Sequence, residues 1–185
     1  MALILALTGE KLSGKDTTAL YLQSRYGAFH VRHSDFLDEI LRILDLSVSR
    51  RNEIDLGMAL RKTFGNGVLG KALMKRVEAS QSPVLAINGV RISDEYQNIR
   101  DMGGHLIYVT APVKMRYERY MNRKLKADDA QQTLQQFQAQ EQEWTEREIS
   151  EIGKKAEYKI TNDGTLEALH QKIDQIMSKL IPRTR

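Results

Sequence analysis

The chain has 185 residues, and its 28 Lys and Arg residues exceed its 24 Asp and Glu residues, which gives a formal net charge of +4. A 41% hydrophobic content at this length supports one packed core and excludes a disordered chain. Because the chain has no cysteine, disulfides, thiolate nucleophiles and cysteine-based metal sites are excluded, and a reducing cytoplasm is the expected compartment. The excess charge is too small to indicate nucleic-acid binding, so small polyanions are the expected partners.

Short apolar runs alternate with segments of helical periodicity along the chain. Strands are predicted over residues 3–7, 28–31, 84–87, 105–109 and 157–160, of which 3–7 and 84–87 are continuous apolar runs. Helical spacing of apolar residues predicts helices over residues 15–26, 36–44, 51–61, 68–79, 94–101, 112–121, 130–152 and from 166 onward. This alternation is typical of a parallel sheet covered by helices on both faces, here with five strands and in one domain, residues 1–185.

Capping residues mark the start of several of these helices. Ser34 and Asp35 are expected to cap the second helix, Ser93 the helix after the third strand, and Thr165 the closing helix. The apolar run at residues 2–7 is far shorter than the roughly 18 residues that a membrane span needs, so we expect no membrane segment. The sequence leaves open whether the protein is a monomer or a homodimer.

Residues 9–15 carry the most specific signal in the chain. They fit the G-x-x-x-x-G-K pattern of a phosphate-binding loop, and they lie between a predicted strand and a predicted helix, as that motif requires. Backbone N–H groups and a helix N-terminus can surround an oxyanion there, and the lysine can reach the terminal phosphates. We therefore predict an ATP site, with Lys15 as a catalytic residue, formed by Gly9, Glu10, Lys11, Leu12, Ser13, Gly14, Lys15, Asp16 and Thr17.

Asp16 departs from this pattern, which expects Ser or Thr as a magnesium ligand after the lysine. A carboxylate there can hold Mg²⁺ through a water molecule, and Thr17 can bond the α-phosphate. Alternatively, Asp16 only complements the N-terminus of the helix. Both interpretations stay open, and ATP and Mg²⁺ are the expected cofactors.

Further polar residues follow the predicted strands, at the edge where parallel α/β sheets bind ligands. Asp35 is a candidate catalytic and acceptor-binding residue that can orient the acceptor. Alternatively, it only caps a helix. Arg91 suits a phosphate clamp, and Glu95 can pair with it. Arg119 and Arg123 are spaced to share one helix face and are catalytic candidates on the lid side, unless that face is simply solvated. The four histidines lack the spacing of a metal motif.

Two segments resemble known families of small kinases. The run Gly14-Lys15-Asp16-Thr17-Thr18 resembles the phosphate loop of phage-type deoxynucleoside monophosphate kinases. A second resemblance, to the later half of dephospho-coenzyme A kinases and their archaeal kinase-like relatives, rests on Ala111, Pro112, Arg116, Arg119, Arg123, Gln140 and residues 160–166. Both groups are small P-loop kinases, so the resemblance implies a three-layer P-loop NTPase fold with a helical lid.

The resemblance also implies where the substrates lie. It implies a lid at about residues 122–132 and an acceptor-binding helical region at about residues 32–80. By the same resemblance, Asn162 and Gly164 lie beside the adenine of ATP.

Two positions on the acceptor side match the kinase pattern incompletely. The arginine expected after the second strand, for the acceptor phosphate, has two nearby candidates, Arg32 and Arg42. We take Arg42 into the predicted acceptor-binding set, with Asp35, Arg91 and Glu95. Asn88 ends the third strand where nucleoside monophosphate kinases commonly have Asp, and a neutral amide cannot supply that charge.

These observations predict an ATP-dependent kinase that phosphorylates a small nucleotide, with a deoxynucleoside or nucleoside monophosphate favoured as the acceptor. Dephospho-coenzyme A is the alternative acceptor. From a different class, an ATP-binding pseudokinase or nucleotide-dependent switch is the other hypothesis, because both Asp16 and Asn88 depart from the enzyme pattern.

Overall fold

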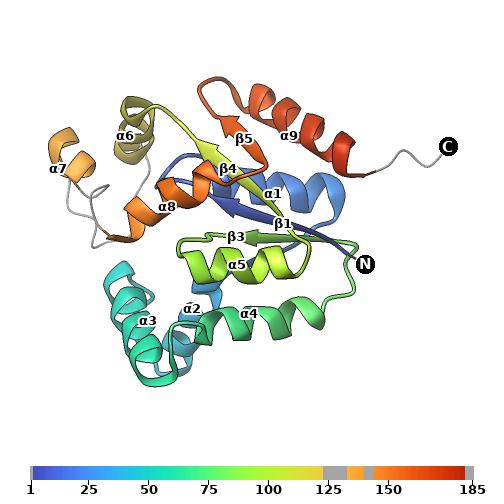
Figure 1. The fold of residues 1–185 in the computed structure, drawn as a ribbon. Coiled ribbons are helices and arrows are strands. Elements are labelled where there is room, and N and C mark those ends of the chain that lie inside the picture. Colours follow the sequence, from blue (N-terminus) through green and yellow to red (C-terminus); the bar gives the residue numbers. More distant parts are fainter. Residues whose placement is uncertain (1, 123–132, 140–143, 182–185) are drawn as a thin grey trace.

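A computed structural model describes residues 2–122, 133–139 and 144–181 of the chain. Its sheet has five strands, which are β1 (Leu3–Thr8), β2 (Phe29–Arg32), β3 (Val84–Asn88), β4 (His105–Thr110) and β5 (Tyr158–Thr161). All paired strands are parallel and their spatial order is β2-β3-β1-β4-β5, so β1 is central. The predicted five-stranded parallel sheet is confirmed, and because the strands are parallel they all end at one edge, as Figure 1 shows for β1, β3, β4 and β5.

Helices cover both faces of this sheet (Figure 1). They are α1 (Lys15–Tyr26), α2 (His33–Ile43), α3 (Arg50–Phe64), α4 (Val68–Glu78), α5 (Ser93–Asp101), α6 (Val113–Asn122), α7 (Leu134–Ala139), α8 (Trp144–Lys154) and α9 (Leu166–Leu180). One core cluster joins α1 and α9 to the sheet, and a second joins α4, α5 and α8 to its other face. Alternate residues of β1 serve the two clusters, because successive side chains of a strand point to opposite faces. The three-layer fold is therefore as predicted.

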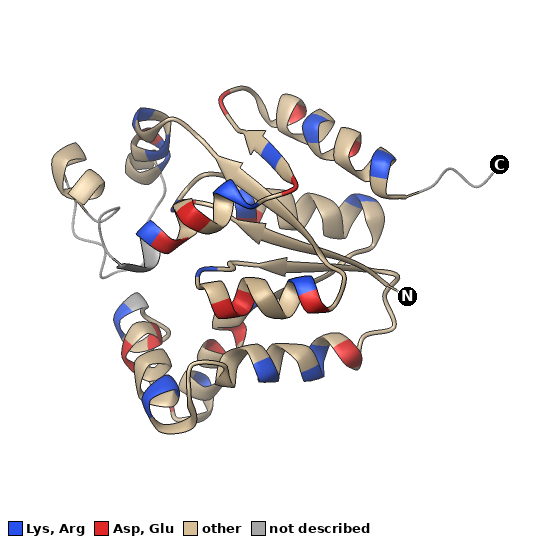
Figure 2. Ribbon diagram, in the orientation of Figure 1, with Lys and Arg blue, Asp and Glu red and all other residues tan. Residues whose placement is uncertain are grey.

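The elements beyond the carboxyl edge of the sheet lie on two sides of it. In Figure 1, α6 and α7 lie above this edge and α3 lies below it. All described helices except α7 carry charged residues of both signs, whereas β1 and β3 carry none (Figure 2). Charged groups therefore reach this edge from the loops, from the first residues of the helices and from Arg32 at the end of β2.

Of the predicted helix caps, Ser34 and Ser93 are wrong, whereas Asp35 does cap its helix, from within the first turn. Helix α2 begins at His33, and the Asp35 carboxylate accepts the backbone N–H of Arg32 at 2.7 Å. Helix α5 begins with Ser93 itself, whose backbone N–H donates to the Glu148 carboxylate at 3.0 Å. The third prediction is confirmed, since the hydroxyl of Thr165 accepts the backbone N–H of Ala168.

The single helix predicted over residues 130–152 is also wrong. Helix α7 packs on α6, whereas α8 packs on α5 and β1, so the two helices belong to different parts of the core. Thr133 precedes α7 and exchanges hydrogen bonds with Gln136, which starts a new helix there. Most of the predicted lid, residues 123–132 with Arg123, lies outside the described residues. None of the described helices is long and apolar enough to cross a bilayer.

Candidate phosphate loop and acceptor region

The phosphate loop between β1 and α1 is compact because two glycines leave room for its neighbours. A Cβ on Gly9 would lie 2.0 Å from the backbone oxygen of Val109, at the end of β4. Gly14 has φ +108°, and a Cβ there would lie 2.2 Å from Nδ2 of Asn162, just past β5. Both glycines of the motif are thus required by the close approach of strands β4 and β5.

Lys15 is the first residue of α1 and is buried. Its Nζ donates to the backbone oxygen of Glu10 at 3.3 Å, so the ammonium group lies across the loop. The N-terminus of α1 adds its partial positive charge at the same place. Together these groups form a site that favours an oxyanion.

Arg119 and Asn162 brace the loop through its backbone oxygens. The guanidinium of Arg119 donates to the oxygens of Leu12 at 3.1 Å and Ser13 at 3.3 Å, and to the oxygen of Asn162 at 3.0 Å. Nδ2 of Asn162 donates to the Ser13 oxygen at 2.8 Å. Because the C=O and N–H of a trans peptide point in opposite directions, the Gly14 N–H faces away from these two braces.

Arg119 and Asn162 therefore lie at the predicted ATP site. Burial and the neighbouring Arg116 lower the pKa of Arg119 below the usual arginine range. Asn162 is buried against the loop backbone, whereas Gly164 lies beyond it and approaches Ala168 of α9. The contacts of Asn162 with the loop were not a feature of the sequence prediction, which expected an adenine neighbour.

The side chains of Glu10 and Lys11 are engaged on the β4 side of the loop. The hydroxyl of Tyr108 donates to the Glu10 carboxylate, and burial together with this carboxylate raises the pKa of Tyr108 to about 12. Nζ of Lys11 lies 5.2 Å from the ring centre of Tyr120 and 6.0 Å from that of Phe137. These contacts join the loop to β4, α6 and α7.

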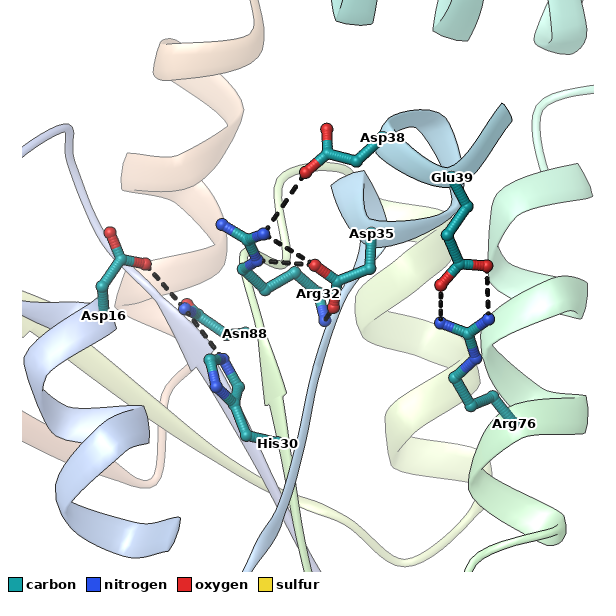
Figure 3. A network of polar contacts seen from close by, with 8 residues as sticks. All are labelled: Asp16, His30, Arg32, Asp35, Asp38, Glu39, Arg76 and Asn88. Carbon is teal, nitrogen blue, oxygen red and sulfur yellow. Dashed lines mark hydrogen bonds and ion pairs between the residues drawn. The ribbon is translucent and has the colours of Figure 1, made fainter. Parts of the chain in front are cut away.

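On the other side of β1, Asp16 contacts Asn88 at the end of β3, which in turn lies beside His30 of β2 (Figure 3). Nδ2 of Asn88 donates to Oδ1 of Asp16 at 2.7 Å and lies 3.5 Å from Nε2 of His30. Asn88 is buried and Asp16 is exposed. Burial lowers the pKa of His30, which favours a neutral imidazole beside the amide.

Arg32 carries the positive charge at the end of β2 (Figure 3). Its guanidinium lies 2.7 Å from the Asp35 carboxylate and 3.4 Å from that of Asp38. Arg42 is exposed in the last turn of α2, about 14 Å along the helix from its start at 1.5 Å per residue. The structure thus places Arg32 rather than Arg42 at the sheet edge, and its position directly after a predicted strand was the available signal.

Glu95 is a buried acid that joins three elements. Its carboxylate accepts the backbone N–H of Arg91 at 2.9 Å and lies 3.6 Å from the guanidinium of Arg61 on α3. Nε2 of His33 lies 3.8 Å from the same carboxylate. The expected association of Glu95 with Arg91 is therefore made through the Arg91 backbone. Sequence analysis missed Arg61, because nothing in its helical pattern distinguishes it from a surface residue.

The described residues contain no cluster of three or more His, Cys, Asp or Glu side chains suited to a metal ion. Mg²⁺ commonly uses one or two carboxylates together with substrate phosphates and water. A single exposed carboxylate, Asp16, at the start of the helix that carries Lys15 fits this requirement. The residues present therefore suit a magnesium ion that arrives with a triphosphate.

Comparisons with other sequences show relatives that carry the name UPF0200 protein. One from Sulfurisphaera tokodaii is 27% identical over 181 residues, which cover 96% of this chain and 97% of the relative. One from Saccharolobus solfataricus is 26% identical and covers 96% of this chain and 94% of its own length. One from Thermococcus gammatolerans is 26% identical over 187 residues, covering 97% of this chain and 96% of the relative. No protein-family model matches the chain.

Comparisons with solved structures support the fold. The Thermus thermophilus protein TT1252 has a TM-score of 0.64 at 21% identity, covering 98% of this chain and 99% of its own. A shikimate kinase from Acinetobacter baumannii, solved with shikimate, has a TM-score of 0.58 at 20% identity, and the match covers 100% of this chain and 97% of that kinase. A shikimate kinase from Bacteroides thetaiotaomicron has a TM-score of 0.64 at 12% identity, and the match covers 96% of this chain and 98% of that kinase. The predicted P-loop fold is confirmed, whereas the finer resemblance to nucleotide kinases stays a prediction.

Proposed function

We propose that this protein is an ATP-dependent kinase that transfers a phosphoryl group to a small nucleotide, with a deoxynucleoside or nucleoside monophosphate as the acceptor. One observation carries the proposal. A phosphate loop with a buried Lys15 follows β1, Arg91 follows the neighbouring strand β3, and Arg32 ends the next strand, β2, at the same edge of the sheet. Cations on both sides of one sheet edge suit a reaction between two phosphorylated substrates.

Phosphoryl transfer requires in-line positioning and positive charge around the transferred group. Lys15 would bind the terminal phosphates, while the braced loop backbone would hold the β-phosphate in place. Asp16 would hold Mg²⁺ through water, and that ion, when bound, neutralises charge that develops on the phosphate oxygens. Arg119 would keep the loop in its binding conformation, and Arg123 stays a lid-side candidate.

On the acceptor side, Arg91 and Arg32 would orient the acceptor phosphate, and Asp35 would orient Arg32. Glu95 would fix the backbone at Arg91, since it accepts that N–H at 2.9 Å. Arg42 is not among the residues proposed to bind the acceptor, because it is exposed at the far end of α2. Dephospho-coenzyme A remains the second phosphorylated acceptor to test.

One further acceptor class is favoured by a specific observation. Asp35 and Asp38 both lie next to Arg32, so a carboxylate and a guanidinium are available together at the end of β2. This pairing also suits a small acid that carries a hydroxyl group, because the arginine binds the acid and a carboxylate accepts the hydroxyl proton. Shikimate, which is bound to one structural neighbour, is the natural probe for this class.

The test is ATP turnover with Mg²⁺ against the common ribo- and deoxyribonucleoside monophosphates, dephospho-coenzyme A and shikimate. We expect one monophosphate to be phosphorylated selectively. Lys15→Ala should lower turnover by at least about 10³-fold, because it removes a charge that contacts the transferred group. The exposed Lys71 of α4 offers a matched control, and Lys71→Ala should keep turnover.

Two results would overturn the proposal. If ATP binds, as followed by calorimetry, and every acceptor stays unchanged, the pseudokinase or switch hypothesis is favoured. If turnover persists in Lys15→Ala, the phosphate loop is not the catalytic site.

A further inference from the structure

Asn88 is the last residue of β3 and is 1% exposed. It is paired in register with Leu7 of β1 and with Arg32 of β2, so its position is set by the centre of the sheet. Its amide nitrogen donates to the Asp16 carboxylate at 2.7 Å (Figure 3). Its amide oxygen is buried without a hydrogen-bond partner.

The orientation of this amide follows from its neighbours. A buried polar atom without a partner destabilises the folded state, so this orientation must be favoured by a stronger contact. Rotation of the amide by half a turn would place its oxygen against the Asp16 carboxylate, and two acceptors repel. The charge-assisted bond from Nδ2 to Asp16 therefore holds the amide in place, and the amide in turn fixes the carboxylate.

The pair can be compared with the usual chemistry of phosphate loops. There, Ser or Thr follows the lysine, an Asp is supplied by a separate strand motif, and both serve the same Mg²⁺. In this chain the acid follows the lysine, and the neutral amide ends the strand next to β1. Each arrangement has one carboxylate and one neutral hydrogen-bonding group, so the local charge is the same.

We infer that Asp16 and Asn88 form a metal-side pair in which the acid and its neutral partner have exchanged positions, with Asn88 as the positioning residue for the Asp16 carboxylate. The inference rests on the proposed function, because it assumes a magnesium–nucleotide complex at the loop. It adds a role for Asn88 that does not depend on which acceptor is used. It also explains how a chain with an amide at this strand end keeps a carboxylate, that of Asp16, on the β3 side of the loop.

The test measures metal binding rather than turnover. Mn²⁺ binding to the protein with a non-hydrolysable ATP analogue can be followed by electron paramagnetic resonance, and binding of the analogue without metal by calorimetry. Asn88→Ala should weaken Mn²⁺ binding about 10–100-fold, as for other residues that orient metal ligands. Affinity for the metal-free analogue should change less than about threefold, since Asn88 is not predicted to contact phosphate.

The exchange itself is tested with Asp16→Ser and with the double variant Asp16→Ser, Asn88→Asp. The single variant lacks a carboxylate and should bind Mn²⁺ at least about tenfold more weakly. The double variant restores the usual arrangement, and we expect its Mn²⁺ affinity to recover to within about tenfold of the original protein. Asn98→Ala, an amide truncation on α5, serves as the control and should change neither affinity.

The outcomes separate the inference from the proposed function. If the original protein binds the analogue and Mn²⁺ while Asn88→Ala binds Mn²⁺ equally well, the positioning role is wrong. If the double variant binds as weakly as Asp16→Ser, the exchange is wrong. If the original protein binds no analogue, the proposed function itself fails. Urea unfolding of each variant shows whether it is folded, and the double variant tests the exchange even where Asn88→Ala is unstable.

Discussion

At the scale of single residues, two glycines with positive φ, Gly9 and Gly103, differ in what surrounds them. The backbone of Gly9 has φ +153°, and a Cβ there would overlap a backbone oxygen of β4. Gly103 also has positive φ, at +71°, but nothing lies within 4 Å of a Cβ added to it. Substitution of Gly103 therefore tests the effect of backbone strain alone, whereas substitution of Gly9 tests backbone strain together with steric overlap.

We predict that Gly103→Ala destabilises the protein by about 1–2 kcal/mol, because only the unfavourable φ contributes. Gly9→Ala should destabilise the protein by about 1–3 kcal/mol more than Gly103→Ala does, because the new Cβ would overlap the Val109 backbone. Urea unfolding of the two variants beside the original protein measures both values. Equal losses of stability at the two positions would show that β4 does not restrict the loop.

At the scale of elements, α2, α3 and α5 meet through buried polar groups rather than through apolar side chains alone. His33 at the start of α2 faces Glu95 of α5, which also faces Arg61 of α3. Burial lowers the pKa of His33, an effect that Arg61 and Arg91 reinforce and that Glu95 and Asp35 oppose. The contact therefore favours the neutral imidazole.

This element contact predicts a pH-dependent stability. A histidine whose pKa is lowered by folding binds fewer protons in the folded state, so stability is complete above its unfolded pKa near 6.5 and falls as pH decreases below it. Urea midpoints at several pH values from about 7.5 to 5 should decrease, and His33→Gln should reduce this slope. His30 also has a lowered pKa, so part of the slope should remain. Parallel curves for the two proteins would contradict the assignment to His33.

At the scale of the whole molecule, the strand order divides the sheet edge at β1. Strands β4 and β5 supply Val109 and Asn162 to one side of the phosphate loop, and β3 and β2 supply Asn88 and Arg32 to the other. A ligand in the loop would thus lie between the two halves of the sheet. Its binding energy should stabilise the complete domain.

We predict that Mg²⁺ with a non-hydrolysable ATP analogue, at about 100 times its dissociation constant, raises the free energy of unfolding by about 2.7 kcal/mol. Lys15→Ala at the same ligand concentration should show a much smaller increase, because the ammonium group across the loop is lost. Urea unfolding with and without ligand measures this difference. A similar increase in both proteins would indicate that the ligand binds elsewhere.

Much of the fold could be predicted from local patterns. Continuous apolar runs mark β1 and β3, and the alternation of strand and helix patterns along the chain indicates a parallel sheet. The phosphate loop was equally predictable, since its glycines, lysine and position between a strand and a helix are all contiguous in the chain. By contrast, Ser34 and Ser93 were wrong as caps, because Asp35 caps α2 from within its first turn and Glu148 of a distant helix accepts the first N–H of α5.

The amino-acid sequence by itself therefore determined the sheet, the loop and the residue types available at the sheet edge. Only the tertiary structure decided which of those residues meet. Asp16 and Asn88 are 72 positions apart and are joined because β3 lies next to β1. Arg32, and not Arg42, reaches the edge because α2 starts directly after β2 and carries later residues away from it. Local patterns record periodicity and turn chemistry, whereas these contacts depend on strand order and helix direction.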